Sequence, residues 1–177
     1  MKNKINFRSE LQCVSSLGNE PLYIGVDIGK TKHVAGFIST TLLLRHQRFE
    51  NCPALPFDNS REGFRALIDR IQSYIPLEQA SAVLEVTGHY HRVLTQYLQE
   101  FNISVYVIHV QKRQAGLLKT DKRDALGLAN MLYNQLEKGV QMSDPLQAVR
   151  RLVPPTDAAI QLKGMVQRRF ELMMEST

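Results

Sequence analysis

The chain lacks the features that mark secreted, membrane-embedded or zinc-binding proteins. Only two cysteines occur, Cys13 and Cys52, and neither has a Cys or His neighbour at the spacing of a zinc site. No apolar run is long enough to span a bilayer, and residues 1–20 contain no apolar core of signal-peptide length. These absences predict a protein of the reducing cytoplasm that does not enter a membrane.

Its size and charge narrow the class further. The chain has 177 residues, which suffice for one domain with a helical appendage. Hydrophobic residues make up 44% and charged residues 22%, as in ordinary folded proteins. The formal net charge of +5 fits a polyanionic partner such as nucleic acid.

The order of the expected elements indicates an α/β domain with a mixed sheet. Hydrophobic patterning predicts strands at 22–28, 33–39, 42–49, 81–87 and 103–108, and helices at 61–75, 89–101, 121–137 and from 157 onward. The first three strands form an antiparallel meander, whereas the later strand–helix–strand order implies parallel pairing. Ser60 and Thr120 are expected N-caps, and the proline-containing segment 51–59 is an expected loop.

Four acids are the strongest candidates for chemistry. Asp27 and Glu85 sit inside apolar, strand-like runs, where a carboxylate is costly to bury without a partner. Asp121 and Asp124 are three residues apart and share one helix face. Because ligands gather at the carboxyl ends of strands in open α/β sheets, we expect the four acids to converge there. Mg²⁺ or Mn²⁺ prefers such oxygen ligands, and a metal pair can act on a phosphodiester.

Two other interpretations stay open at this point. Acids near strand ends commonly cap turns, and acids in a first helical turn are favoured by the helix dipole alone. In addition, the segment from Asp27 to Thr31, followed by a hairpin, looks like the phosphate loop of actin-like ATPases. The second Asp-Gly-rich phosphate motif of those proteins is not found. The combination of all four acids favours the metal site.

Basic residues accompany the acids along the chain. We expect them to contact nucleic-acid phosphates, the alternative being a solvated basic surface. The candidates are Lys30, Lys112, Arg113, Lys119, Lys122 and Arg123.

Three segments resemble one family. They are Ile-Gly-Val-Asp-Ile-Gly-Lys at 24–30, Leu-Glu-Val-Thr-Gly-His-Tyr at 84–90 and Lys-Thr-Asp-Lys-Arg-Asp-Ala at 119–125. In order and rough spacing they are similar to the motifs of DEDD-type insertion-sequence transposases, which include pilin-gene invertases and bridge-RNA-guided recombinases. The resemblance covers the chain from about residue 22 to its end.

This resemblance implies a RuvC-like, RNase H-type domain over 21–140, after a flexible lead-in at 1–20. By motif, Asp27, Glu85, Asp121 and Asp124 would be the catalytic, Mg²⁺-binding acids. Residues 149–152 and 166–169 look like parts of a helical, coiled-coil-forming extension over 141–177, through which the chain would form a homo-oligomer. The implied partners are DNA and a structured guide RNA.

The family's C-terminal domain supplies a serine thought to act in strand exchange, and this sequence ends before it. Complete transposition by this polypeptide is therefore not expected. A non-catalytic module that only binds DNA or RNA is the alternative to a metal-dependent enzyme.

Overall fold

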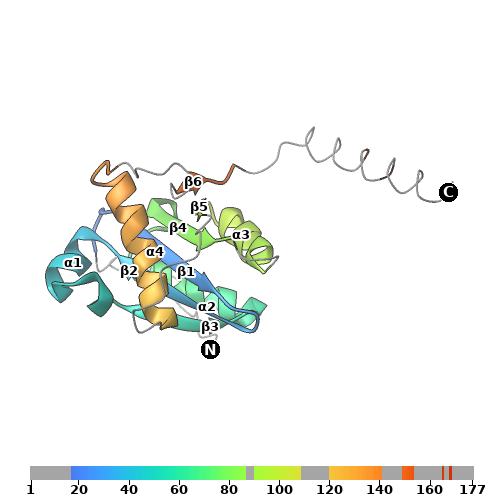
Figure 1. The fold of residues 1–177 in the computed structure, drawn as a ribbon, viewed down its shortest axis with the longest axis horizontal. Coiled ribbons are helices and arrows are strands. Elements are labelled where there is room, and N and C mark those ends of the chain that lie inside the picture. The colour runs from blue at the N-terminus through green and yellow to red at the C-terminus, as the bar shows by residue number, and fades with distance from the viewer. Residues whose placement is uncertain are drawn as a thin grey trace, which may run out of the picture.

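The computed structural model describes residues 17–86, 90–108, 120–140 and 149–153, together with Met165 and Arg168. Within this part of the chain, the strands form one mixed sheet in the order β3-β2-β1-β4-β5-β6 (Figure 1). The strands are β1 (Leu22–Ile28), β2 (Lys32–Ile38), β3 (Ala54–Asp58), β4 (Ala80–Glu85), β5 (Ser104–Ile108) and β6 (Arg150–Arg151). The helices are α1 (Thr40–His46), α2 (Arg61–Gln72), α3 (His91–Glu100) and α4 (Asp121–Leu136), with short 3-10 turns η1 (Phe49–Asn51) and η2 (Leu77–Gln79).

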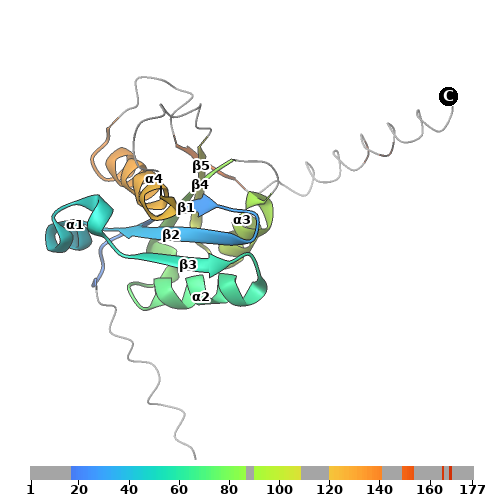
Figure 2. The same ribbon diagram turned by 60° about the horizontal axis from the view of Figure 1, so that its bottom comes forward.

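The pairing of the strands confirms the predicted mixed sheet. β1 lies in the middle, antiparallel to β2 and parallel to β4, and β4 is parallel to β5. Helix α4 crosses one face of the sheet, while α2 and α3 lie on the other (Figure 2). This layered α/β architecture is compatible with an RNase H-like fold.

Both predicted N-caps are confirmed. The Ser60 hydroxyl accepts a hydrogen bond from the Gly63 N–H at 3.1 Å at the start of α2, and Thr120 accepts one from the Arg123 N–H at 3.2 Å at the start of α4. Side-chain acceptors of this kind satisfy backbone donors that have no partner within the helix. The start of α4, which carries two of the candidate acids, is therefore fixed by local sequence.

The strand predicted at 42–49 is wrong, because the segment forms α1 followed by η1. Ser39 initiates the helix, since its hydroxyl accepts the Leu42 N–H at 3.2 Å. A short apolar run such as Leu42 to Leu44 does not reveal by periodicity whether it is strand or buried helix.

The loop predicted at 51–59 is also wrong, because it contains β3. Among the described strands, β3 pairs only with β2 and forms an edge of the sheet. Proline is tolerated in an edge strand because no neighbour there needs its missing N–H, which explains how Pro56 can lie within β3.

The third difference lies at 149–152, where a helical segment was expected. Arg150 and Arg151 instead form β6, antiparallel to β5. The side chain of Gln135 holds this segment by donating to the Val149 carbonyl at 2.8 Å and accepting its N–H at 3.0 Å. The open edge of β5 offers backbone groups that a passing chain can pair with. Met165 and Arg168 are helical, as predicted.

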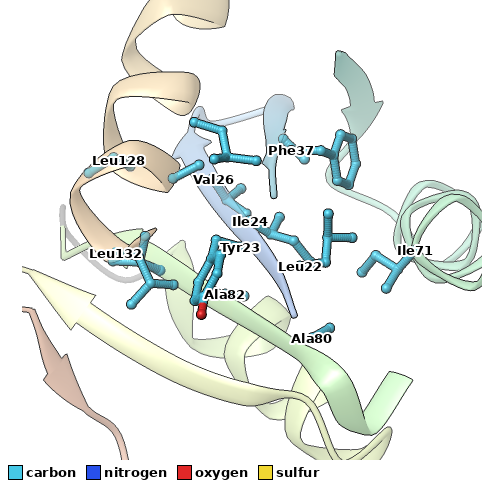
Figure 3. Packing of buried hydrophobic residues seen from close by; sticks show 14 of the residues in the cluster. Leu22, Tyr23, Ile24, Val26, Phe37, Ile71, Ala80, Ala82, Leu128 and Leu132 are labelled. Carbon is cyan, nitrogen blue, oxygen red and sulfur yellow. The ribbon is translucent and has the colours of Figure 1, made fainter. Parts of the chain in front are cut away.

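The core is divided by the sheet into two layers. On one side of β1, Leu22 and the β2 residue Phe37 point toward Ile71 of α2 (Figure 3). On the other side, Leu128 and Leu132 of α4 cover the sheet (Figure 3). No helix in the described ranges is long and apolar enough to cross a membrane.

Candidate functional site: the acidic edge beneath helix α4

Asp27 and Glu85 lie side by side at the ends of two parallel strands. In the register of β1 and β4, Val26 is paired with Leu84. Asp27 directly follows Val26, and Glu85 directly follows Leu84. Both side chains therefore point to the same face of the sheet, opposite to Val26 and Leu84. Both are half-buried.

Helix α4 lies on that same face and runs antiparallel to β1. Near the start of β1, the Tyr23 ring packs edge-on against Tyr133 with centroids 5.5 Å apart. The Tyr23 hydroxyl donates to the Glu137 carboxylate at 2.6 Å. Burial in the first place, and then Glu137, raises the pKa of Tyr23, so this bond persists through neutral pH. The contact anchors the C-terminal end of α4 over the beginning of β1.

Farther along β1, Gly25 lets the helix backbone touch the sheet. A Cβ atom at Gly25 would stand less than 3.0 Å from the Ala125 carbonyl oxygen, the Ala129 nitrogen and the Leu128 Cβ. At the paired position in β2, a Cβ at Gly36 would meet Leu126 in the same way. Glycine is required at both positions because any side chain would push α4 off the sheet.

This alignment places Asp27 opposite the first turn of α4. Two residues of a strand span about 6.6 Å, and four residues of a helix span about 6 Å. Moving two residues along β1 therefore moves about one turn back along the antiparallel α4. Tyr23 faces the last turns and Gly25 the middle, so Asp27 faces the turn that contains Asp124. Asp124 is half-buried, whereas Asp121 is exposed at the rim.

The chemistry of these residues suits a hard divalent cation, since carboxylate oxygens are the ligands that Mg²⁺ and Mn²⁺ prefer. Among the described residues, no group of three or more His, Cys, Asp or Glu side chains could hold a metal ion. The fold thus brings the acids to a common edge without gathering them into a closed ligand set.

The turn that follows Asp27 is held by a buried histidine. The Gly29 N–H donates to Nδ1 of His33 at 3.2 Å, and the Asn59 amide donates to the Lys30 carbonyl at 3.1 Å. Burial lowers the pKa of His33, an effect that a hydrogen bond with the Asn59 side chain partly opposes. The neutral imidazole is the form that can accept the Gly29 proton. Sequence reasoning missed His33, which it treated only as the start of a strand.

Lys122 and Arg123, on the first turn of α4, line a cleft of about 320 Å³ with Arg48, Glu50, Asn51 and Thr120. Arg48 escaped the sequence analysis because it fell in the strand predicted at 42–49, and Glu50 because it lay between that strand and the loop predicted at 51–59. Lys30 is exposed in the hairpin after Asp27. The other predicted phosphate contacts, Lys112, Arg113 and Lys119, lie outside the described residues.

The domain is thus of the α/β class with a mixed sheet, and Asp27 and Glu85 lie at the carboxyl ends of its parallel strands, where ligands bind in open α/β sheets. Comparison with known families then specifies the class. A family model described as a transposase, of the DEDD IS110 type, matches residues 24–177. The chain belongs to this transposase family. No curated protein matched the chain.

Proposed function

We propose that this domain carries out divalent-metal-dependent chemistry on DNA phosphodiesters during transposition. Membership of the transposase family supports DNA as the substrate. The observation that carries the proposal is the neighbouring placement of Asp27 and Glu85 on β1 and β4, facing the turn of α4 that contains Asp124. The match runs through the hairpin after Asp27, which favours a transposase over an actin-like ATPase.

In this proposal, Asp27, Glu85, Asp121 and Asp124 hold Mg²⁺ or Mn²⁺. When bound, the metal would neutralise charge on the reacting phosphate and lower the pKa of an attacking water or hydroxyl. The protein contributes the placement: the two strands fix Asp27 and Glu85, and α4 brings Asp124 over them. Asp124 directly precedes Ala125, whose carbonyl oxygen lies against Gly25, so the close contact of α4 with β1 supports a position of Asp124 near Asp27.

The test is a calorimetric titration of the full chain with Mg²⁺ and with Mn²⁺. Asp27→Asn and Asp124→Asn should each weaken binding at least about tenfold, because each removes a charged ligand. Asp69→Asn is the matched control, since Asp69 is exposed on α2 beneath the other face of the sheet and should leave binding unchanged. Absence of saturable binding, both without DNA and with it, would disprove the metal site.

A second candidate is a non-catalytic module that docks DNA or RNA. It is favoured by the lack of a three-ligand group among the described residues. The two candidates differ in a cleavage assay with excess metal or with chelator. A metal-dependent enzyme loses activity in Asp27→Asn and in chelator while still binding DNA. A docking module shows the same binding in every condition and no metal-dependent product.

The remaining partners are also proposals. We infer that a structured guide RNA and a second copy of the chain, joined through residues 141–177, complete the working assembly. These inferences rest on the family and on the helical positions of Met165 and Arg168. Light scattering of the full chain and of a variant that ends at residue 153 would test the role of the extension.

A further inference from the structure

The cleft between η1 and the start of α4 has the composition of a phosphate site. Arg48 reaches it from the residue before η1, while Lys122 and Arg123 reach it from α4. Thr120 lines the same space, and its hydroxyl keeps its own proton to donate after accepting the Arg123 N–H. With Glu50 as the acid of this group, three cations face one anion, so the lining carries a net charge of +2.

The Glu50 carboxylate holds two of the cationic side chains in place but does not neutralise the net positive charge of the cleft. Its Oε1 lies 3.4 Å from Nη2 of Arg48 and 3.8 Å from Nη2 of Arg123, so one carboxylate holds two guanidinium groups from different elements. The Glu50 backbone N–H, followed by the two arginines, lowers the pKa of this carboxyl, which is therefore ionised at neutral pH. The arginine side chains remain 72% and 41% exposed, and thus accessible to a ligand.

Lys122 is exposed and lines the same cleft, near Cys52. Burial raises the pKa of the Cys52 thiol, and the nearby Lys122 ammonium partly opposes that rise, so the thiol is neutral at pH 7. Cys52 itself is buried and does not face the cleft as a nucleophile. Lys122 and Arg123 lie between Asp121 and Asp124 in the first turn of α4. A phosphate in the cleft would therefore lie within one helical turn of the acidic edge.

We propose that this cleft, formed by Arg48, Lys122 and Arg123, binds a backbone phosphate of the nucleic acid and positions the strand beside the acids, with Glu50 as a built-in competitor. The proposal deepens the proposed function, since it names the contact that places the substrate. When no phosphate is bound, Glu50 forms ion pairs with Arg48 and Arg123, and its negative charge repels an entering phosphate. Removing its charge should strengthen binding, whereas removing any of the three cations should weaken it.

The test is fluorescence anisotropy of the full chain with labelled duplex DNA, single-stranded DNA and single-stranded RNA over a range of KCl concentrations. The buffer contains EDTA, so that binding is measured without divalent metal. Arg48→Gln, Lys122→Gln and Arg123→Gln should each weaken binding about threefold to tenfold and reduce the slope of log K against log salt by about 0.9. Glu50→Gln should strengthen binding about threefold and steepen the slope.

The matched control is Lys138→Gln, which removes one positive charge just beyond the opposite end of α4, where the ammonium lies over the Tyr133 ring. If the cleft variants behave like Lys138→Gln, the cleft is not the binding site. If Glu50→Gln weakens binding, the competitor role is wrong. All three probes share the phosphodiester group, and whichever binds most tightly and responds to the variants identifies the source of the phosphate.

The outcome can be separated from that of the metal titration. Cleft-dependent binding in EDTA together with failed Mg²⁺ and Mn²⁺ titrations would keep the cleft and remove the metal chemistry. Saturable metal binding with no response to the cleft variants would do the reverse. No binding of any nucleic acid by the wild-type chain would overturn the cleft proposal.

Discussion

Helices cover the two faces of the sheet in different ways. On the α2 and α3 side, large apolar side chains separate helix from sheet, as where Leu22 and Phe37 meet Ile71. On the α4 side, Gly25 and Gly36 remove that separation and the backbones touch. Side chains can repack around a small change, whereas backbone contact cannot. The face that carries the acids is therefore the one whose helix position is fixed most tightly.

The largest effect is expected from adding one methyl group on the α4 side of the sheet, where helix and strand backbones touch. Gly25→Ala should lower the free energy of unfolding by about 4 kcal/mol, because its Cβ would collide with α4 backbone atoms that cannot move alone. It should also weaken metal binding by lifting Asp124 away from Asp27. Urea unfolding and Mg²⁺ titration measure the two effects.

Gly127→Ala is the matched control for that experiment. Gly127 lies inside α4, and a Cβ there meets nothing within 4 Å. Alanine should therefore stabilise the helix by about 0.5–1 kcal/mol. If Gly25→Ala and Gly127→Ala change the free energy of unfolding equally, the close backbone contact at Gly25 does not fix the position of α4.

The opposite face is tested by removing atoms. Ile71→Ala should cost about 3 kcal/mol, since Ile71 is fully buried against the sheet and its loss leaves a cavity. Because α2 does not carry the candidate acids, Mg²⁺ affinity of the folded fraction should stay unchanged. Calorimetry below the unfolding midpoint checks this, and a loss of affinity would show that the two faces are coupled.

A smaller effect is expected at the C-terminal anchor of α4. Tyr23→Phe removes the 2.6 Å hydrogen bond to Glu137 but keeps the ring packed on Tyr133. The expected loss is about 1 kcal/mol, because Glu137 is exposed and regains water when the bond is lost. Glu137→Ala, which removes the acceptor, should add little in combination with Tyr23→Phe, and additive losses in this double-mutant cycle would contradict the bond.

The smallest effect concerns pH and the hairpin after Asp27. Burial lowers the pKa of His33 below its usual 6.5, so the unfolded chain binds more protons than the native one just below that pH. Stability should therefore be constant above about pH 6.5 and fall on further acidification, until the native imidazole is also protonated. His33→Gln should flatten this part of a plot of unfolding free energy against pH. An unchanged slope would assign the acid sensitivity to another group.

Local sequence predicted much of the framework. The apolar run at 22–28 is β1, and the caps Ser60 and Thr120 start the helices where expected. The errors at 42–49 and 51–59 have different causes: the short apolar run at 42–44 does not distinguish strand from helix, whereas the 51–59 segment depends on its distant partner β2. Pro56 is acceptable only because β3 is an edge strand, and edge position is a property of the whole sheet.

For the candidate site too, some features could be predicted from the sequence and others depend on the tertiary structure. Sequence alone singled out Asp27 and Glu85 because a carboxylate in an apolar run is costly to bury, and Asp121 and Asp124 because their spacing after the Thr120 cap puts them on one helix face. The partnership of Arg48 and Glu50 with Arg123 joins residues more than 70 positions apart, and no periodicity encodes it. What only the tertiary structure decided is the contact of α4 with Gly25, since the close approach of two backbones depends on how the layers pack.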